Sequence, residues 1–529
     1  MVRGALKASL AAFMACSAVA LAAVAHAAEP SVERGRQVYE FGLGASGEPI
    51  RATSAAGVEL VGADAACTHC HRRSGMGSRE GRLVIPPVAA PILFAPGRSA
   101  MPERAGREPP RIEPLRHESR DAYDDERLVK ALRHGMDSSG RALDALMPRY
   151  ALHEDDEAAL LAYLHRLGRD AEPAVDRGTL RLATLITPDA EPHRAQVVER
   201  AMRAWARSGA LGGLPIELQV WRLTGPAAAW DEQLQGLLRR DRPFAVLSGA
   251  GGAQWRPVRD FCERSALPCL FPVVDYAPDD GADAYNVYFS RGVPLEARLL
   301  AAHIREQAGV TRVLQWIDET RGTAGREAAE RLKAELGAGY EVSVQRFDAL
   351  EDDMAAMPPA ADVVVAWLGT DALRRMVQRL PEALHGVPVF LSSRLAPPAE
   401  VALPPAWRRD AAWVSAGSDP ARLHGKGVLG LLPWSQQLGI PLDDEALLSE
   451  VYAATYFFGD ALARMRGPWS RDWLIETIEA SHFTRPAGAA FFSLSLGPGQ
   501  REAAKAGHLL RYTDGAILSA EGPLLQPWR

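Results

Sequence analysis

Residues Cys67–His71 read CTHCH, and this stretch is the most specific signal in the chain. Two cysteines lie three positions apart, and a histidine follows the second one directly. In a C-x-x-C-H pattern, each thiol can bond one vinyl group of a porphyrin, and the histidine can ligate the iron from one side. We therefore predict that Cys67 and Cys70 attach one haem c covalently and that His71 is the proximal ligand of its iron.

Two other kinds of site use cysteines at this spacing. A redox-active dithiol usually follows a strand, and a zinc site needs two further Cys or His residues nearby. Residues 62–66 read GADAA, which is not strand-like, and no second cysteine pair follows until Cys262 and Cys269. Both alternatives are therefore less favoured than haem, provided that the protein is exported.

The N-terminus predicts export. Arg3 and Lys7 precede an apolar run over residues 8–25, and Ala25-His26-Ala27 forms a small-residue cleavage motif. This pattern is typical of a secretory signal peptide over residues 1–28, although Cys16 leaves lipid attachment as an alternative. No later stretch is apolar enough to span a bilayer, so we expect a soluble periplasmic protein after signal cleavage.

Composition adds limits on size and partners. The 529 residues are 47% hydrophobic and 24% charged, which is enough for two to four domains. A net charge of −6 over this length argues against nucleic acid as a partner. In an oxidising compartment, Cys262 and Cys269 could form a disulfide, with two buried free thiols as the alternative.

Residues 29–169 form the first predicted domain, in which two helices bracket the haem motif. One helix begins near Ser31, and the other spans about 155–167 with an apolar stripe. This arrangement resembles an all-α class I cytochrome c, whose terminal helices cross at a small and an aromatic residue. Gly35 and Tyr39 on the first helix and Tyr163 on the last match that crossing.

The sixth iron ligand is expected on a loop before the last helix. Met76, Met101, Met136 and Met147 all follow the motif. Residues 135–150 resemble the loop that carries the axial methionine in class I cytochromes c, and Pro148 fixes the backbone just after Met147. We therefore predict Met147, with His134 or Met136 as alternatives.

Two further features of this domain have open interpretations. The resemblance implies that a carbonyl before Pro86 or Pro87 accepts the ring N–H of His71. Residues 91–125 could wrap the haem edge as an ordered loop, or they could be an insertion without function. One haem with both axial positions filled is typical of an electron carrier.

Residues 170–177 are polar and aperiodic, and they are expected to be a linker to a second domain over 178–529. In this domain, short apolar strands alternate with amphipathic helices, which predicts parallel sheets covered on both faces. The expected strands and helices include 180–186, 192–208, 216–221, 230–239, 244–247, 313–317, 325–336, 341–347, 363–368 and 387–391. The domain is too long for one such sheet, so we expect two α/β lobes.

The order of these elements resembles the type I periplasmic solute-binding fold of leucine/isoleucine/valine-binding proteins. The matching stretches are Leu182–Thr187, Leu247–Gly252 after a strand, and a late helix over Val451–Leu462. Tyr288–Arg291 would lie near the first crossing between the lobes. Proteins of this family close two lobes around a small ligand by hinge motion.

Six residues are candidates for solute binding within this resemblance. Ser248 and Gly249 would offer a hydroxyl and backbone N–H groups at a helix start, where a carboxylate or carbonyl could bind. The others lie at or near expected strand ends, where open α/β sheets bind ligands, and they are Tyr288, Asp318, Trp367 and Ser392. A glycine-rich turn or a strand-end aromatic can equally be a structural feature.

These features favour an electron-transfer cytochrome fused to a solute-binding module. Its partners would be a periplasmic redox protein and a small organic solute, such as an amino acid, an amide or a carboxylate. The alternative is the substrate-binding component of an ABC transporter or sensor, with haem as its redox input. Because the larger domain contains no catalytic motif, an enzyme that oxidises the solute through haem is the least favoured function.

Overall fold

The computed structural model describes residues 32–44, 46–80, 83–97, 119–169, 178–211, 214–281, 283–319, 322–347, 360–379, 386–417, 430–465, 469–480, 491, 494–513 and 517–526. The predicted signal peptide at 1–28 and the predicted linker at 170–177 lie outside these residues. None of the helices in the described ranges is long and apolar enough to cross a membrane.

Contacts between residues divide the chain into two compact units. Unit 1 comprises Met1–Ala171 and Arg466–Trp473, and unit 2 comprises Glu172–Met465 and Leu474–Arg529. The helix α16 (Arg471–Glu479) therefore begins in a segment that groups with unit 1 and ends in unit 2. Each unit is described separately below.

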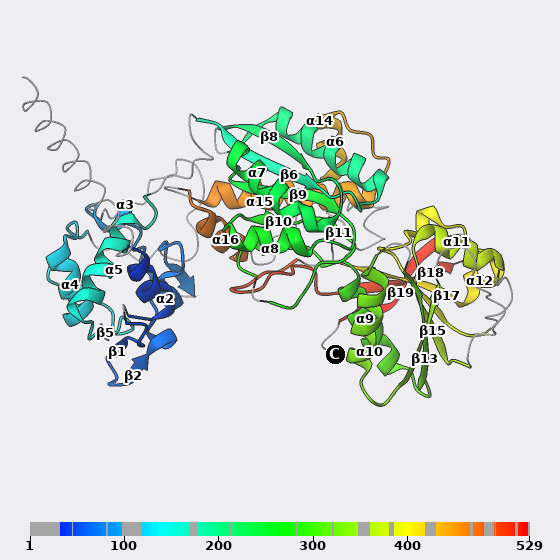
Figure 1. Ribbon diagram of the computed structural model, residues 1–529, viewed down its shortest axis with the longest axis horizontal. Helices are drawn as coiled ribbons and strands as arrows, with labels where there is room; N and C mark the ends of the chain where they lie inside the picture. The colour runs from blue at the N-terminus through cyan, green and yellow to red at the C-terminus, as the bar shows by residue number, and fades with distance from the viewer. Residues whose placement is uncertain are drawn as a thin grey trace, which may run out of the picture. The chain divides into compact units, whose positions relative to one another are not determined.

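Unit 1 consists mainly of helices with two small antiparallel sheets among them (Figure 1). Its described elements are a helix at residues 32–41, β1 (Arg51–Thr53), β2 (Glu59–Val61), η1 (Gly62–Ala65), α2 (Thr68–His71), β3 (Ser78–Glu80), β4 (Leu83–Ile85), α3 (Ala90–Leu93), α4 (Asp125–His134), β5 (Arg149–Tyr150) and α5 (Glu154–Arg166). One sheet has the order β2-β1-β5, and the other is the hairpin β3-β4.

The prediction of an all-α first domain is therefore wrong in one respect. Ala52 of β1 pairs with Leu60 on one side and with Tyr150 on the other. These strands are only two or three residues long, and their extended backbones satisfy one another's N–H and C=O groups.

The predicted crossing of the two terminal helices is present in unit 1. A Cβ atom added to Gly35 would lie 2.0 Å from the carbonyl oxygen of Ala159 in α5, so only glycine allows this approach. One turn along, the rings of Tyr39 and Tyr163 lie with their centroids 5.3 Å apart. The crossing closes an apolar core that also contains Leu160, Leu164 and Cys67.

Unit 2 contains two sheets, each covered by helices, and each sheet with its helices forms one lobe (Figure 1). The first lobe contains β6 (Leu180–Ile186), α6 (Pro192–Ser208), β7 (Ala210–Leu211), β8 (Leu214–Arg222), η3 (Ala227–Ala229), α7 (Trp230–Asp241), β9 (Ala245–Gly251), α8 (Arg256–Arg264), β10 (Cys269–Leu270), β11 (Val273–Val274) and β12 (Asn286–Val287). Its sheet has the order β12-β10-β9-β6-β8-β7, and β11 also pairs with β9.

Two later helices, α14 (Leu431–Leu438) and α15 (Glu445–Arg464), also belong to the first lobe. Figure 1 shows α15, in orange, beside the green elements of this lobe, and α15 contacts both α6 and β9. β6 is almost continuously apolar and buried, as expected for a central parallel strand covered on both faces.

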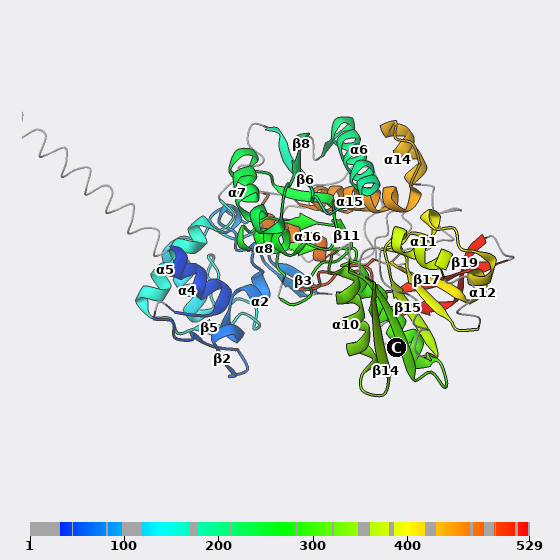
Figure 2. The ribbon, with the colours of Figure 1, turned by 45° about the vertical axis from the view of Figure 1, so that its right-hand side comes forward.

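The second lobe contains α9 (Val293–Glu306), β13 (Arg312–Asp318), α10 (Ala324–Leu336), β14 (Glu341–Phe347), β15 (Val363–Trp367), α11 (Thr370–Arg379), β16 (Val389–Ser392), η4 (Pro398–Glu400), α12 (Pro405–Asp410), β17 (Ala411–Ala416), β18 (Gly507–Thr513) and β19 (Ile517–Leu525). Its sheet has the order β14-β13-β15-β16-β17-β18-β19. The first five strands are parallel, and the red strands β18 and β19 continue the sheet in antiparallel directions (Figure 2).

Three connections join the described elements of the two lobes. The chain leaves the first lobe between β12 and α9, returns between β17 and α14, and leaves again between α15 and β18. Tyr288, just after β12, forms a parallel bridge with Glu502, so the first and third connections lie side by side. Chain segments that connect two lobes in this way are the places where hinge motion is absorbed.

Candidate functional site

The CTHCH motif forms the short helix α2 and the residue before it. Cys67 precedes α2 and is buried, whereas Cys70 is exposed, and neither cysteine is in a disulfide. The Thr68 hydroxyl donates to the Glu40 carbonyl at 3.1 Å, and the Tyr39 hydroxyl donates to the Arg72 carbonyl at 2.8 Å. The motif is therefore held against the helix at residues 32–41.

His71 has one ring nitrogen fixed by the backbone. Its Nδ1 lies 2.9 Å from the Pro86 carbonyl oxygen, and the side chain is buried. This carbonyl precedes Pro87, so of the two expected positions the structure selects the carbonyl before Pro87. Burial lowers the pKa of His71, which favours the neutral imidazole that ligates a metal. With Nδ1–H bound to a carbonyl, Nε2 is the nitrogen that can ligate iron.

The surroundings of Cys67 argue against an attacking thiolate at this residue. Burial raises the pKa of its thiol to about 12. A dithiol that exchanges needs a thiolate, and hence a lowered pKa at an accessible cysteine. Tyr150 lies beside this thiol and donates its hydroxyl to the Ala65 carbonyl at 2.9 Å.

The loop that carries Met147 reaches the same core. Met147 is partly buried and packs against the apolar cluster that contains Cys67, Leu132 and Tyr150. The alternative ligand His134 is the last residue of α4 and is exposed. The other alternative, Met136, forms an isolated bridge with Ala142. Ligation of iron by Met147 stays a prediction.

The residues of unit 1 fit a covalently attached haem. A buried imidazole with one nitrogen already bonded lies directly after two cysteines that are not joined to each other, and a methionine loop packs on the same core. Within the part of the chain that the structure describes, no three His, Cys, Asp or Glu side chains are grouped to hold a metal ion.

The structure corrects the predicted location of Ser248 and Gly249. They were expected after a strand at a helix start, but β9 continues to Gly251 and α8 begins only at Arg256. The pairing of β9 with β6 shifts register here, and Ser248 has a φ of 56°. A Cβ atom on Gly249 would lie 2.5 Å from the Leu185 carbonyl oxygen. The small residues allow a bulge inside a buried strand.

Tyr288 lies where the first connection leaves β12, as expected, but its side chain is fully buried in the core of the first lobe. The Arg291 guanidinium lies over its ring, 4.6 Å from the centroid. Burial raises the pKa of the Tyr288 hydroxyl. The residue is therefore placed to support the connection between the lobes.

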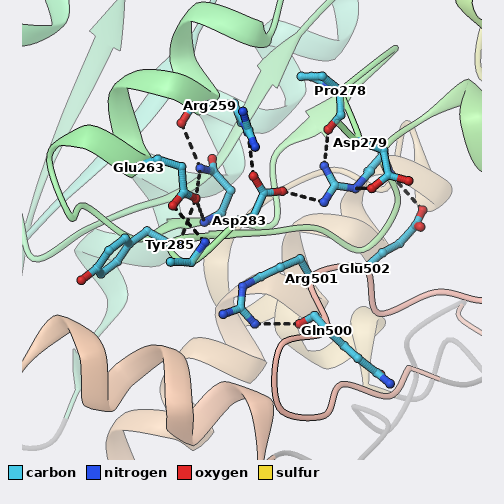
Figure 3. Close-up of polar contacts among 12 residues, drawn as sticks. Arg259, Glu263, Pro278, Asp279, Asp283, Tyr285, Gln500, Arg501 and Glu502 are labelled. Carbon is cyan, nitrogen blue, oxygen red and sulfur yellow. Dashed lines mark hydrogen bonds and ion pairs between the residues drawn. The ribbon is translucent and has the colours of Figure 1, made fainter. Parts of the chain in front are cut away.

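Arg291 pairs with Asp283, which belongs to a buried ionic network at this connection. Figure 3 shows Asp283 of this network together with Arg259 and Glu502. Asp283 lies between two arginines and accepts from Arg259 Nε and from Arg291 Nη2, each at 2.6 Å. On the neighbouring third connection, Glu502 accepts from the backbone N–H of Arg291 at 3.2 Å. The network ties the first and third connections together.

The three candidates in the second lobe have different surroundings. Trp367, at the end of β15, is fully buried and donates Nε1–H to Gln315 Oε1 at 2.8 Å, so it is a core residue. Asp318 ends β13 and is buried. Ser392 ends β16, and its hydroxyl donates to the Glu296 carboxylate. These three candidates therefore belong to the second lobe, whereas the other three belong to the first.

A group of charged residues between the lobes was missed in the sequence. We call Arg194, Asp275, Arg394 and Glu450 the interlobe cluster. Arg194 of α6 donates to Asp275 at 2.6 Å and to the Arg394 carbonyl at 3.5 Å. Arg394, which follows β16 in the second lobe, pairs with Glu450 of α15 in the first lobe at 3.1 Å.

Glu296 borders this cluster in the second lobe. It lies in the first turn of α9, is almost completely buried, and accepts from the Ser392 and Ser393 hydroxyls and from the Arg394 backbone N–H. Burial raises its pKa to about 7. No sequence signal marked it, because its donors are 96 to 98 residues away along the chain.

Cys262 and Cys269 form a disulfide, with their Cα atoms 6.2 Å apart. The bond joins the end of α8 to the start of β10, both in the core of the first lobe. This is the connection that the sequence predicted for an oxidising compartment.

Comparison with solved structures identifies the fold of unit 2. A substrate-binding periplasmic protein from Ralstonia solanacearum matches with a TM-score of 0.51 and 13% identity, over 65% of this chain and 100% of that one. An ABC transporter substrate-binding protein from Sphaerobacter thermophilus matches with 0.50 and 19%, over 66% and 98%. Unit 2 has the two-lobed periplasmic-binding fold.

A third structure with this fold is a possible leucine/isoleucine/valine-binding protein from Rhodopirellula baltica. It matches with a TM-score of 0.51 and 11% identity, over 66% of this chain and 97% of that one. At these identities the likeness establishes the fold alone. The sequence matches no protein-family model and no curated protein.

The raised pKa of Glu296 predicts a pH-dependent stability of unit 2. Its folded pKa of about 7 lies above the ordinary 4.5, so the folded state holds a proton that the unfolded state loses. This contribution is present in full below pH 4.5 and is lost as pH rises through 7. The Glu296→Gln variant mimics the protonated carboxyl. The wild type should therefore lose up to about 3 kcal/mol of unfolding free energy relative to this variant between pH 4.5 and 8.

Urea unfolding followed by tryptophan fluorescence measures this difference, because Trp255 and Trp367 lie in the two cores of unit 2. Glu306→Gln, at the exposed far end of α9, is the matched control and should show no such trend. An equal difference between the wild type and Glu296→Gln at every pH would contradict the assignment.

Proposed function

We propose that this protein is an exported solute-binding protein that carries one covalently attached haem c. In this proposal, unit 2 binds a small organic solute and the haem of unit 1 is a redox input to that unit. The haem assignment rests on one observation. His71 is buried directly after Cys67 and Cys70, and its Nδ1 is hydrogen-bonded to the Pro86 carbonyl. The proposal of solute binding rests on the two-lobed fold of unit 2.

The comparisons favour this function over an electron carrier with an attached module. Two of the matching structures are named as substrate-binding proteins and one as a possible leucine/isoleucine/valine-binding protein, and each matches about two thirds of this chain and nearly all of its own length. A periplasmic location and a transporter or sensor as partner would follow from the same fold. These neighbours are also binding proteins rather than enzymes.

When bound, haem supplies a one-electron couple at iron, and axial methionine raises its reduction potential. The chain's own groups define the rest of the site. Pro86 orients the His71 ring, Cys67 and Cys70 would hold the group at α2, and the apolar core around Leu132 and Tyr150 would keep water from it. Met147 would be the second protein ligand of the iron.

A second function is supported by one observation. The interlobe cluster links the two lobes directly through Arg394 and Glu450. A lobe pair that is joined by its own side chains could serve as a docking scaffold for a periplasmic redox partner. The protein would then be an electron-transfer cytochrome, and the solute would be a modulator of electron flow.

Substitution of Met147 tests the proposed axial ligand. The Met147→Ala variant should lose the methionine–iron charge-transfer band of the oxidised protein and have a lower reduction potential, because the thioether favours ferrous iron. The measurement is the visible spectrum of the oxidised holoprotein. Met136→Ala is the control, and loss of the band in this variant instead would show that the ligand is Met136.

Coupling between the two units tests the proposed function as a whole. If reduction changes the affinity for solute, saturating solute must change the redox equilibrium constant of the iron by the same factor. A tenfold preference for one redox state should shift the potential by about 59 mV. Candidate amides, carboxylates and amino acids are first screened by calorimetry on the holoprotein. Binding without any change of potential in a redox titration would contradict the redox input.

A further inference from the structure

A carboxylate lies just after the end of a strand in the first-lobe sheet. Asp189 follows β6, and its Oδ2 accepts from the Gln254 backbone N–H at 2.9 Å, while its Oδ1 accepts from the Thr187 hydroxyl at 2.6 Å. A Cβ atom on Gly252 would lie 2.4 Å from the Asp189 carbonyl oxygen and 2.6 Å from Oδ2. The turn after β9 is therefore fitted closely around Asp189.

This turn faces the second lobe. A Cβ atom on Gly322, in the loop between β13 and α10, would lie 3.3 Å from the Cβ atom of Ala253. Donors that follow the carboxyl ends of parallel strands are where open α/β sheets bind anionic groups of ligands. Here the chain's own Asp189 accepts from the Gln254 and Thr187 donors.

The second observation concerns a cation from the opposite lobe. The Arg394 guanidinium reaches Glu450 on the first lobe at 3.1 Å, and both side chains are largely buried. The backbone carbonyl oxygen of Arg394 accepts from Arg194, and the Arg194 guanidinium is itself paired with Asp275 at 2.6 Å. Its backbone N–H is bound to Glu296. The acidic groups Glu450 and Asp275 are thus already matched by arginines of this chain.

A free α-amino acid presents one carboxylate and one ammonium group. The carboxylate needs N–H or O–H donors, and the ammonium group needs carboxylate oxygens. Asp189 supplies the first charge in the turn after β9, and Arg394 supplies the second where it contacts the first lobe. An amino acid would have to displace both from partners that are partly removed from water.

From these contacts we infer that Asp189 and Arg394 are specificity-determining residues through which unit 2 rejects free α-amino acids. Asp189 occupies the donors of the turn after β9, and Arg394 joins the second lobe to Glu450 of the first lobe without a solute. The inference deepens the proposed solute-binding function and rests on it. Among the expected solute classes, it leaves uncharged compounds such as amides.

Hydrogen exchange on the full-length holoprotein, read by mass spectrometry, tests the role of Arg394. Without any solute, peptides over residues 250–256 and 392–396 should be protected in the wild type. Arg394→Ala should speed exchange about tenfold in both peptides, although they belong to different lobes. Arg375→Ala, at an exposed position on α11 of the same lobe, is the matched control and should leave both unchanged.

Two further variants keep the test decisive if Arg394→Ala folds poorly. Glu450→Gln removes the partner charge with little change of shape and should also speed exchange in both peptides. The exchanged pair Arg394→Glu with Glu450→Arg should restore protection. Faster exchange confined to the peptide of the substituted lobe would overturn the inference.

Calorimetry with leucine, glutamate and arginine tests the specificity directly. The wild-type holoprotein should bind none of them, and none should add protection to either peptide. Binding of any of the three, with new protection in both peptides, would overturn the inference. Acetamide and larger amides are titrated in parallel. The amides could also fail to bind while the hydrogen-exchange results are as predicted. In that case the proposed solute binding is wrong, but the direct contact between the lobes through Arg394 is supported.

Discussion

The two-lobed unit depends on a buried ion pair network at the point where the chain first leaves the first lobe. Asp283 is buried between Arg259 and Arg291, and the Glu263 carboxylate accepts from the backbone N–H groups of the same segment. Removing one partner of such a buried group typically costs about 3–5 kcal/mol, because the remaining charge is left without compensation. The network fixes where the first connection starts and, through Glu502, where the third connection passes beside it. These charges therefore help to set where the second lobe is joined to the first.

A comparable constraint organises unit 1. The close approach at Gly35 sets the helix at residues 32–41 against α5, and the hydroxyl of Tyr39 then holds the carbonyl of Arg72 at the end of α2. The backbone of the CTHCH motif is fixed by this contact before any cofactor is considered. The Pro86 carbonyl fixes the His71 ring from the other side. A covalently attached haem needs a pre-oriented imidazole, and the contacts around the CTHCH motif provide one.

Local patterns predicted the elements of unit 2 well and its polar contacts poorly. The bounds of β6 and α6 follow from an apolar run and from Pro192 at the helix start, so both were predictable. The glycines after Ser248 suggested a turn, but pairing with β6 keeps them in a strand, and no local signal reports a ladder partner. The pairing of β1 with β5 in unit 1 was missed because Ala52 and Tyr150 are almost a hundred residues apart. Glu296 and Arg394 were missed for the same reason, since their partners lie in distant segments.

The central claim is that one chain combines a covalent haem with a two-lobed binding unit. The most direct measurement is the intact mass of the denatured protein after expression in a host that attaches haem c. We predict a mass that exceeds that of the polypeptide, without its signal peptide, by one haem, and a Cys67→Ala, Cys70→Ala variant without this addition. An unmodified wild-type mass from a host that attaches haem to a control cytochrome would contradict the claim.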